Sequence, residues 1–325
     1  MSTYLYIFAR HTRYALHDSA GDTCTNKEKT MMRRIWTTAV AMLSALWAMA
    51  QQIDYKIEND RMVADITVNE KHKAHAYVDP SAAFHIIDST YLAKSGLQLT
   101  TRPMRAKLPF LAEGCEQVNA SHMLRIPLTL NGMQTNRVVY VADLSRLAHA
   151  LKVKQMDMLV GFGLTATDGS KTLTMLKDEK RLVWDKAEEQ DIIGDKANIV
   201  MDNRFLIIEG KVNITDAIND ITSLEGRYLL DPNTPESLIL YGGNKAVSDV
   251  LNKSDIRFRI FERDKKPITY IPKATLSTLG TSATYTDVFI YPEQAIPFIG
   301  IIGREWIAKG NLVLNFDDMT AGVKR

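Results

Sequence analysis

The chain has 325 residues, of which 40 are Lys or Arg, 38 are Asp or Glu and two are Cys, and 46% are hydrophobic. A single hydrophobic core rarely grows past about 250–300 residues, so this length indicates about two domains. The composition excludes a disordered, collagen-like or disulfide-dense protein. The formal charge of +2 gives no sign of nucleic-acid binding, which clustered excess Lys and Arg would indicate.

Residues 31–52 contain the three parts of a secretory signal in the right order. Arg33-Arg34 supplies the positive start, residues 35–47 form an apolar run, and Ala48-Met49-Ala50 is a small-residue cleavage site before the polar Gln51-Gln52. The apolar run is shorter than the roughly 20 residues that a membrane-spanning helix needs. The pattern predicts an exported protein, placed in the periplasm, the cell envelope or the medium, with no stable membrane span after signal removal.

A signal peptide at 31–50 implies a translation start at Met31 or Met32, with residues 1–30 upstream of it. Without the first 50 residues the chain has 34 basic and 35 acidic residues, a formal charge of −1. It also keeps a single cysteine, Cys115, so no internal disulfide can form. We expect Cys115 to be a small buried or partly buried residue rather than a nucleophile.

The remaining sequence is typical of a mostly β protein. Residues 62–68 and 256–261 alternate as strands do. Asn131-Gly132 lies between residues 124–130 and 138–141 and predicts a tight hairpin of these two segments, because Asn-Gly readily adopts positive φ. Short helices are expected at 89–95, 144–151 and 246–253.

An internal repeat is the most informative pattern in the chain. A strand-like segment ends in Asp79-Pro80-Ser81, and a second one ends in Asp231-Pro232-Asn233. Each is followed by a short apolar strand and a helix-like stretch. An apolar segment then ends in a glycine, Gly161 or Gly303, which lies 82 residues after Asp79 or 72 residues after Asp231. Two copies of one layout predict two lobes, 51–190 and 191–325.

These segments resemble the aspartic peptidases of the retropepsin and pepsin type. The resemblance rests on 78–83 leading to 92–97, and on 298–306 followed by 312–317. It covers most of residues 60–185 and 205–322. It implies an all-β, bilobal fold, in which two retropepsin-like β lobes enclose a cleft, as in a bacterial exported aspartyl protease-like protein.

The resemblance also implies a catalytic pair, Asp79 and Asp231, that shares a proton and hydrolyses peptide bonds by general acid–base catalysis. The family's Asp-Thr-Gly is changed to Asp-Pro-Ser and Asp-Pro-Asn here, which removes the hydroxyl residue that ties the two loops together. Ser81 and Asn233 are the candidates to support the loops, and Gly161 and Gly303 are structural glycines. We expect weak hydrolysis of peptides in the cleft.

Other interpretations of the same residues remain open. Asp-Pro after a strand is a common turn, and needs no catalytic role. The protein is alternatively a non-catalytic peptide- or protein-binding component of the cell envelope, or a structural component with a vestigial cleft. In each case the expected partner is a peptide or protein, not nucleic acid.

No cofactor or metal is expected. Residues 161–166 fit the dinucleotide fingerprint G-x-G-x-x-A, but turn-like sequence follows instead of a helix, so the match is attributed to chance. His72 and His75 would face opposite sides of a strand and make a poor metal pair.

Overall fold

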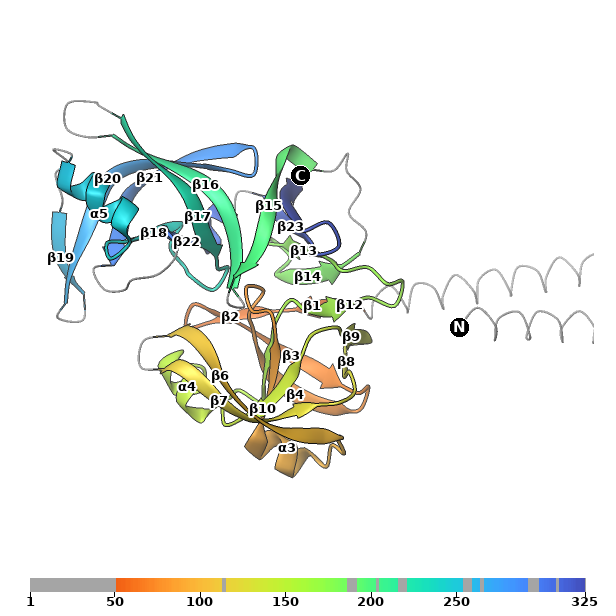
Figure 1. Ribbon diagram of the computed structural model, residues 1–325. Helices are drawn as coiled ribbons and strands as arrows, with labels where there is room; N and C mark the ends of the chain where they lie inside the picture. Colours follow the sequence, from red (N-terminus) through yellow and green to blue (C-terminus); the bar gives the residue numbers. More distant parts are fainter. Residues whose placement is uncertain are drawn as a thin grey trace, which may run out of the picture. The chain divides into compact units, whose positions relative to one another are not determined.

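The computed structural model describes residues 51–112, 115–185, 192–202, 205–215, 221–253, 259–263, 266–291, 298–307 and 310–324 (Figure 1). Strands predominate among these residues, which confirms the all-β expectation. The predicted signal peptide at 31–50 lies outside the described residues, as does the first half of the strand expected at 256–261. Of the latter, only Arg259 onward is described, as a strand.

Eleven strands form a sheet in the first half of the chain. They are β2 (Lys56–Glu58), β3 (Arg61–Val68), β4 (His72–Val78), β5 (His85–Asp88), β6 (Thr101–Ala112), β7 (Cys115–Leu124), β8 (Thr129–Leu130), β9 (Met133–Thr135), β10 (Val139–Ala142), β11 (Met158–Val160) and β12 (Leu164–Thr165). Their order is β12-β9-β8-β3-β4-β11-β5-β10-β7-β6, with β2 paired to β3 beside this path.

Thirteen strands form the second sheet. They are β1 (Gln52–Asp54), β13 (Thr172–Leu176), β14 (Arg181–Trp184), β15 (Ile192–Asp202), β16 (Phe205–Thr215), β17 (Ile221–Leu230), β18 (Leu238–Tyr241), β19 (Arg259–Arg263), β20 (Lys266–Thr278), β21 (Thr281–Tyr291), β22 (Gly300–Ile302), β23 (Asn311–Asn315) and β24 (Thr320–Lys324). The order is β1-β14-β13-β23-β24-β15-β16-β17-β22-β18-β21-β20-β19.

This second sheet has two parts with different roles. The six strands from β16 to β20 in that order close into a barrel, because β16 also pairs with β20. The other part runs β1-β14-β13-β23-β24-β15 and joins strands from both ends of the described chain (Figure 1). Strands β13 and β23 pair antiparallel at its centre. The two halves of the chain are therefore hydrogen-bonded into one sheet.

The described helices are short. They are α3 (Ser89–Ser95), α4 (Ser145–Ala150), α5 (Lys245–Lys253) and α6 (Arg304–Ile307). Helix α3 begins where the Asp88 carboxylate accepts hydrogen bonds from the backbone N–H groups of Thr90 and Tyr91, and it ends at Gly96, which has φ of 71°. Such an N-cap and left-handed glycine are the signals that delimit a helix in sequence. The helices expected at 89–95, 144–151 and 246–253 are confirmed to within one residue at each end.

The strand pairings of the two halves repeat one pattern. In the first half, β11 pairs parallel with β4 and antiparallel with β5, and β5 pairs parallel with β10. In the second half, β22 pairs parallel with β17 and antiparallel with β18, and β18 pairs parallel with β21. The repeat in the sequence thus corresponds to a repeat in the topology, and it puts the ends of β4 and β17 in equivalent environments.

The predicted hairpin around Asn131-Gly132 is partly wrong. The two turn residues do have positive φ, 46° and 80°, but the turn joins β8 to β9, and each of these strands has only two or three residues. Residues 138–141, the expected partner, overlap β10, which pairs with β5 and β7. Local turn chemistry fixed the turn, whereas the partner of β10 was set by pairing with strands distant in the sequence.

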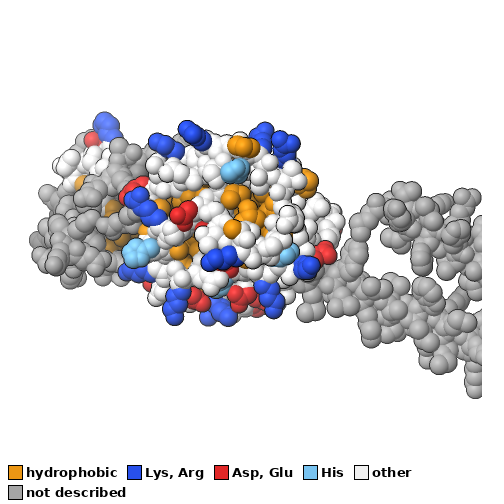
Figure 2. All heavy atoms as spheres, turned by 90° about the horizontal axis from the view of Figure 1, so that it is seen from below, with side chains coloured by type: hydrophobic (Ala, Val, Ile, Leu, Met, Phe, Trp, Pro, Cys, Tyr) orange, Lys and Arg blue, Asp and Glu red, His pale blue; other side chains and the backbone are white. Residues whose placement is uncertain are grey.

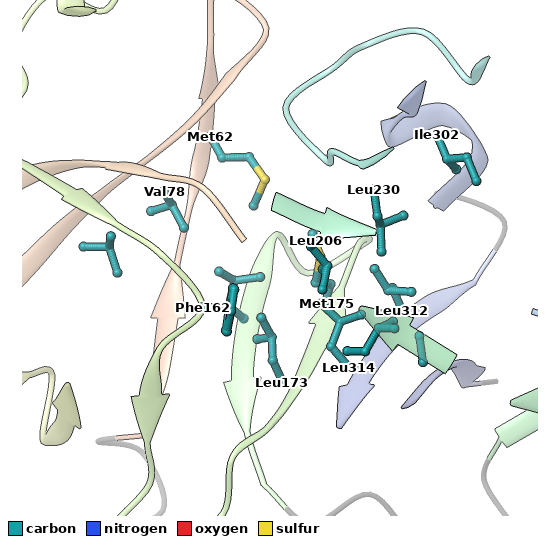
Figure 3. Packing of buried hydrophobic residues seen from close by; sticks show 14 of the residues in the cluster. Met62, Val78, Phe162, Leu173, Met175, Leu206, Leu230, Ile302, Leu312 and Leu314 are labelled. Atoms are coloured by element: carbon teal, nitrogen blue, oxygen red, sulfur yellow. The ribbon is translucent and has the colours of Figure 1, made fainter. Parts of the chain in front are cut away.

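One hydrophobic core spans both halves. Figure 3 shows Met62, Val78 and Phe162 from the first half in the same cluster as Leu206, Leu230 and Ile302 from the second. Residues of β13 and β23 complete the cluster, and Phe162 stacks on Phe316 with ring centroids 4.1 Å apart. Because the apolar faces of both halves are buried together, the loops at the ends of β4 and β17 are anchored on the same hydrophobic core.

The surface carries charges of both signs. Figure 2 shows acidic and basic side chains next to one another along the lower edge of the face in view, with hydrophobic side chains towards its centre. This distribution agrees with the nearly balanced composition. Within the described part of the chain, no helix is long and apolar enough to cross a membrane.

Candidate functional site

Asp79 and Asp231 lie at equivalent points, directly after β4 and β17. The Asp79 N–H donates to the Val160 carbonyl at 2.8 Å, and the Asp231 N–H donates to the Ile302 carbonyl at 3.0 Å. Each bond continues a parallel strand pair by one residue. The repeat therefore fixes the backbone of the two aspartates in the same way.

The proline after each aspartate fits a tight turn. The Ala82 N–H donates to the Asp79 carbonyl at 3.0 Å, and the Thr234 N–H donates to the Asp231 carbonyl at 3.1 Å. Pro80 and Pro232 occupy the second position of these turns, where their fixed φ is favourable and no backbone N–H is needed. Both aspartates therefore begin a tight turn of the same kind, with proline as its second residue.

The Asp79 carboxylate is held by its own loop. The backbone N–H of Ser81 donates to Asp79 Oδ1 at 3.0 Å, and Ser81 Oγ donates to the same oxygen at 2.5 Å. Among the described residues, none donates to Asp79 Oδ2. Asp79 is half-buried and Ser81 is buried. Ser81 thus hydrogen-bonds to the Asp79 carboxylate, and within the described part of the chain it makes no bond to the second half.

The Asp231 carboxylate receives one bond on each oxygen. The Asn233 N–H donates to Oδ1 at 2.8 Å, and Thr234 Oγ1 donates to Oδ2 at 2.7 Å. The sequence analysis did not single out Thr234. A threonine three residues after an aspartate is an ordinary local capping pattern, and this signal in the sequence could have identified it.

Asn233 is the residue that connects the two loops. Its Nδ2 donates to the carbonyl of Val78, the residue before Asp79, at 3.0 Å, and its Oδ1 accepts from the N–H of Met62 at 2.8 Å. The side chain is 1% exposed. Both bonds cross from the second half of the chain to the first. Asn233 therefore makes a loop-to-loop connection of the kind that the altered motifs were expected to lack, one position later than the family's hydroxyl.

The two aspartates line one pocket. Its empty volume is about 530 Å³, part of it open to solvent, and its lining comes from both halves: Arg61, Tyr77, Asp79, Ser81, Ala82, Phe84, Pro109, Phe110, Leu151, Phe205, Leu229 and Asp231. The polar side chains are gathered around the aspartates, and the rest of the lining is apolar. A cavity with an apolar wall and a few polar groups is the usual form of a ligand site.

The protonation of Asp79 depends on Asp231. Burial, followed by the negative charge of Asp231, raises the pKa of Asp79 to about 6, while the Ser81 hydrogen bonds and the Arg61 charge oppose the rise. Two neighbouring carboxyl groups that repel each other in this way can share one proton. Below about pH 6 the Asp79 carboxyl therefore keeps a proton, as a general acid must.

Tyr77 and Arg61 are site residues that the sequence analysis missed. Burial raises the pKa of the Tyr77 phenol well above its usual value, and the charges of Asp79 and Asp231 add to the rise, so Tyr77 remains a neutral hydroxyl. Arg61 begins β3, and its Nη1 donates to the Asn233 carbonyl at 2.9 Å. Tyr77 lies on β4, two residues before Asp79, and this spacing could have identified it, whereas Arg61 reaches the pocket through the pairing of β3 with β4.

Gly161 and Gly303 occupy equivalent positions beside the two loops. A Cβ on Gly161 would lie 2.3 Å from the Ala82 carbonyl oxygen, and a Cβ on Gly303 would lie 1.9 Å from that of Glu236. Both clashes are with backbone, which cannot rotate away. The strands that end at these glycines can approach the aspartate loops this closely only without a side chain.

The other sequence motifs lie outside this site. Gly161-Phe162-Gly163 is followed by the short strand β12 rather than a helix, and the buried His85 side chain bonds to its backbone. His75 bonds to Asp65 at 2.9 Å. In the described parts of the chain, no three His, Cys, Asp or Glu residues are grouped to hold a metal ion. Cys115 is buried, which raises the pKa of its thiol.

Comparisons with known proteins give no assignment. No protein-family model matches the chain, and no curated protein matches it.

Proposed function

We propose that this protein is an exported, bilobal aspartic-peptidase-like protein that binds peptides in the cleft containing Asp79 and Asp231 and hydrolyses them weakly. The observation that carries this proposal is the presence of both carboxylates in one pocket, at equivalent points of a repeated topology. Each carboxylate is held by hydrogen bonds from its own loop. The repeated aspartate loops support the proposal, because the resemblance to retropepsins and pepsins implies one catalytic aspartate in each half of the chain.

The chemistry follows from the coupled protonation of the pair. With one proton shared, the ionised carboxylate accepts a proton from a water molecule, while the protonated one donates a hydrogen bond to the carbonyl oxygen of the scissile peptide bond. Water attacks the carbonyl carbon, and the leaving amine takes a proton as the C–N bond breaks. No covalent intermediate with the protein is needed. Weak activity is expected because Pro80 and Pro232 stand where the family's Asp-Thr-Gly has a hydroxyl residue that hydrogen-bonds between the loops.

The test is hydrolysis of a mixture of quenched fluorescent peptides by protein produced from the full chain. Asp79→Asn and Asp231→Asn should each reduce cleavage to background, because the pair works as a unit. Asp65→Asn is the matched control, since Asp65 is exposed on β3 and does not line the pocket. Cleavage that persists unchanged in both pocket variants would sink the hydrolytic proposal.

A peptide-binding cleft without hydrolysis is the second candidate. The observation in its favour concerns Asn233, which occupies the position of the glycine in the family's Asp-Thr-Gly. Its side chain hydrogen-bonds to the first half of the chain and so has a structural role. In that case peptides bind with the same affinity to the unaltered protein and to Asp231→Asn, and mass spectrometry shows them intact after long incubation.

A further inference from the structure

Arg61 is placed at the pocket by contacts on either side of it. The preceding residue, Asp60, accepts hydrogen bonds from Arg304 at its backbone carbonyl, 3.1 Å away, and at its carboxylate, 3.2 Å away. The following residue, Met62, donates its N–H to Asn233. Both contacts join the first half of the chain to the second. The backbone of Arg61 is therefore fixed before any ligand arrives, which is the condition for a preorganised binding group.

The guanidinium of Arg61 has donors left over. Nη1 bonds to the Asn233 carbonyl, whereas Nε is buried and has no hydrogen-bond acceptor among the described residues. A buried donor without an acceptor is unfavourable, and an arginine cannot remove the problem by losing its proton. Its planar fork matches the two oxygens of a carboxylate. Arg61 lines the pocket and is half-buried, so its guanidinium brings a positive charge to the pocket, and among the described residues its Nη groups make one hydrogen bond, that of Nη1 to Asn233.

The other wall of the pocket is apolar and aromatic. Phe84 and Phe110 contact each other edge to face, with ring centroids 5.9 Å apart, and Leu151 and Phe205 also line the wall. Phe205 comes from β16 in the second half, and its backbone forms a bridge with Ala82. A large apolar side chain is the chemical group that fits such a wall.

The charges in the pocket permit an anion beside Arg61. The aspartate pair carries about one negative charge when it holds one proton, and Arg61 carries one positive charge, so together they are close to neutral. The guanidinium lies near the pair, because Arg61 lines the same pocket as Asp79 and Asp231 and its Nη1 donates to the carbonyl of Asn233, two residues after Asp231.

We propose that Arg61 binds a carboxylate of the peptide ligand, so that the cleft selects peptides in which a carboxylate lies next to a large apolar residue. This inference rests on the proposed peptide-binding function and specifies its substrate class. The carboxylate is either the C-terminus of the peptide or the side chain of an acidic residue, and the two sources are separated by the choice of peptides.

The experiment measures dissociation constants by isothermal titration calorimetry with protein from the full chain, using two pairs of acetylated peptides. One pair, Ac-Ala-Ala-Phe-Glu-Ala-NH2 and its Gln analogue, tests an acidic side chain. The other, Ac-Ala-Ala-Ala-Phe as free acid and as amide, tests the C-terminus. We expect the acid of at least one pair to bind about tenfold more tightly than its neutral partner, because a hydrogen bond between charged groups replaces a neutral one.

Arg61→Gln should abolish this preference, and Arg61→Lys should reduce it, because lysine keeps the charge but not the fork. Arg181→Gln is the matched control: it removes another arginine, but Arg181 bonds to Asp54 and Glu179 at the surface and does not line the pocket, so the preference should persist. The comparison of acid with amide in the unaltered protein needs no variant and remains valid if Arg61→Gln fails to fold.

Each outcome separates this inference from the function on which it rests. Equal affinity for acids and neutral partners in the unaltered protein overturns the role of Arg61 and leaves peptide binding standing. Loss of the preference in Arg181→Gln as complete as in Arg61→Gln overturns it too. Failure of all four peptides to bind overturns both proposals. A preference for the acid without any cleavage supports the inference and selects the non-catalytic candidate.

Discussion

Asn233 Nδ2 donates a hydrogen bond to the carbonyl of Val78, at 3.0 Å, across 155 residues of sequence. Val78 is the last residue of β4 and immediately precedes Asp79, so this bond connects the loop of one aspartate to the strand that carries the other. The same side chain accepts the Met62 N–H. A single buried amide thus joins the loop of Asp231 to two strands of the first half of the chain, β3 and β4.

Asn233→Ala should destabilise the protein by about 2–4 kcal/mol, because it leaves a buried carbonyl and a buried N–H without partners. Urea denaturation followed by circular dichroism measures the change. Asn213→Ala is the control, since Asn213 bonds to Ser223 at the surface, and it should cost less than about 0.5 kcal/mol. Equal losses in the two variants would show that Asn233 is not a structural connection.

The pH dependence of hydrolysis should show a basic limb near pH 6. Burial and the charge of Asp231 raise the pKa of Asp79 to about 6, so the pair loses its shared proton above that pH and kcat/KM falls. Ser81→Ala removes a hydrogen bond that lowers this pKa, and the limb should therefore move to higher pH. A limb that stays in place, or moves to lower pH, would contradict the assignment of this step to Asp79.

His85 should make the protein less stable in mild acid. Burial lowers the pKa of His85 to about 4, and the Gly161 N–H donates to Nδ1, which leaves Nε2–H to donate to the Gly163 carbonyl at 2.8 Å. The folded state therefore keeps a neutral imidazole, whereas the unfolded chain binds a proton below about pH 6.5. Stability contributed by the neutral ring is present above pH 6.5 and is lost as pH falls towards 4, by about 3 kcal/mol in total.

The check is the free energy of unfolding at several pH values between 7 and 4. His85→Gln should remove most of the decrease in the free energy of unfolding between pH 7 and 4. His149→Gln should not, because His149 is exposed. The same dependence of the unfolding free energy on pH in the unaltered protein and in His85→Gln would refute this role of His85.

Alanine at Gly161 or Gly303 should be strongly destabilising, by about 2–4 kcal/mol, because the added Cβ meets backbone carbonyl oxygens at 2.3 Å or 1.9 Å. Gly210→Ala provides the contrast, since its Cβ would lie 3.3 Å from the Tyr228 ring, a side chain that can shift slightly. Thermal unfolding temperatures of the three variants decide the matter. If Gly210→Ala loses as much stability as Gly161→Ala, close backbone approach is not the cause.

Export should remove the first 50 residues. The Ala48-Met49-Ala50 pattern predicts cleavage before Gln51, and Ala48→Arg should block it by placing a large charged residue where a small one is required. N-terminal sequencing of the exported protein gives the cleavage point. Recovery of protein that begins upstream of Met31 from the medium or the periplasm would disprove the signal-peptide assignment.

The sequence determined those features that depend on neighbouring residues. Asp88 and Gly96 delimit α3, Asn131-Gly132 forms a turn, and the recurrence of Asp-Pro after a strand marks the two loops, because capping, positive φ and alternation act over a few residues. Tertiary structure decided which strands pair and which distant side chains meet. It paired β10 with β5 and β7, linked Asn233 to Val78, and placed Arg61 in the pocket of Asp79 and Asp231. Such contacts depend on the burial of apolar faces contributed by both halves of the chain, so no short segment encodes them.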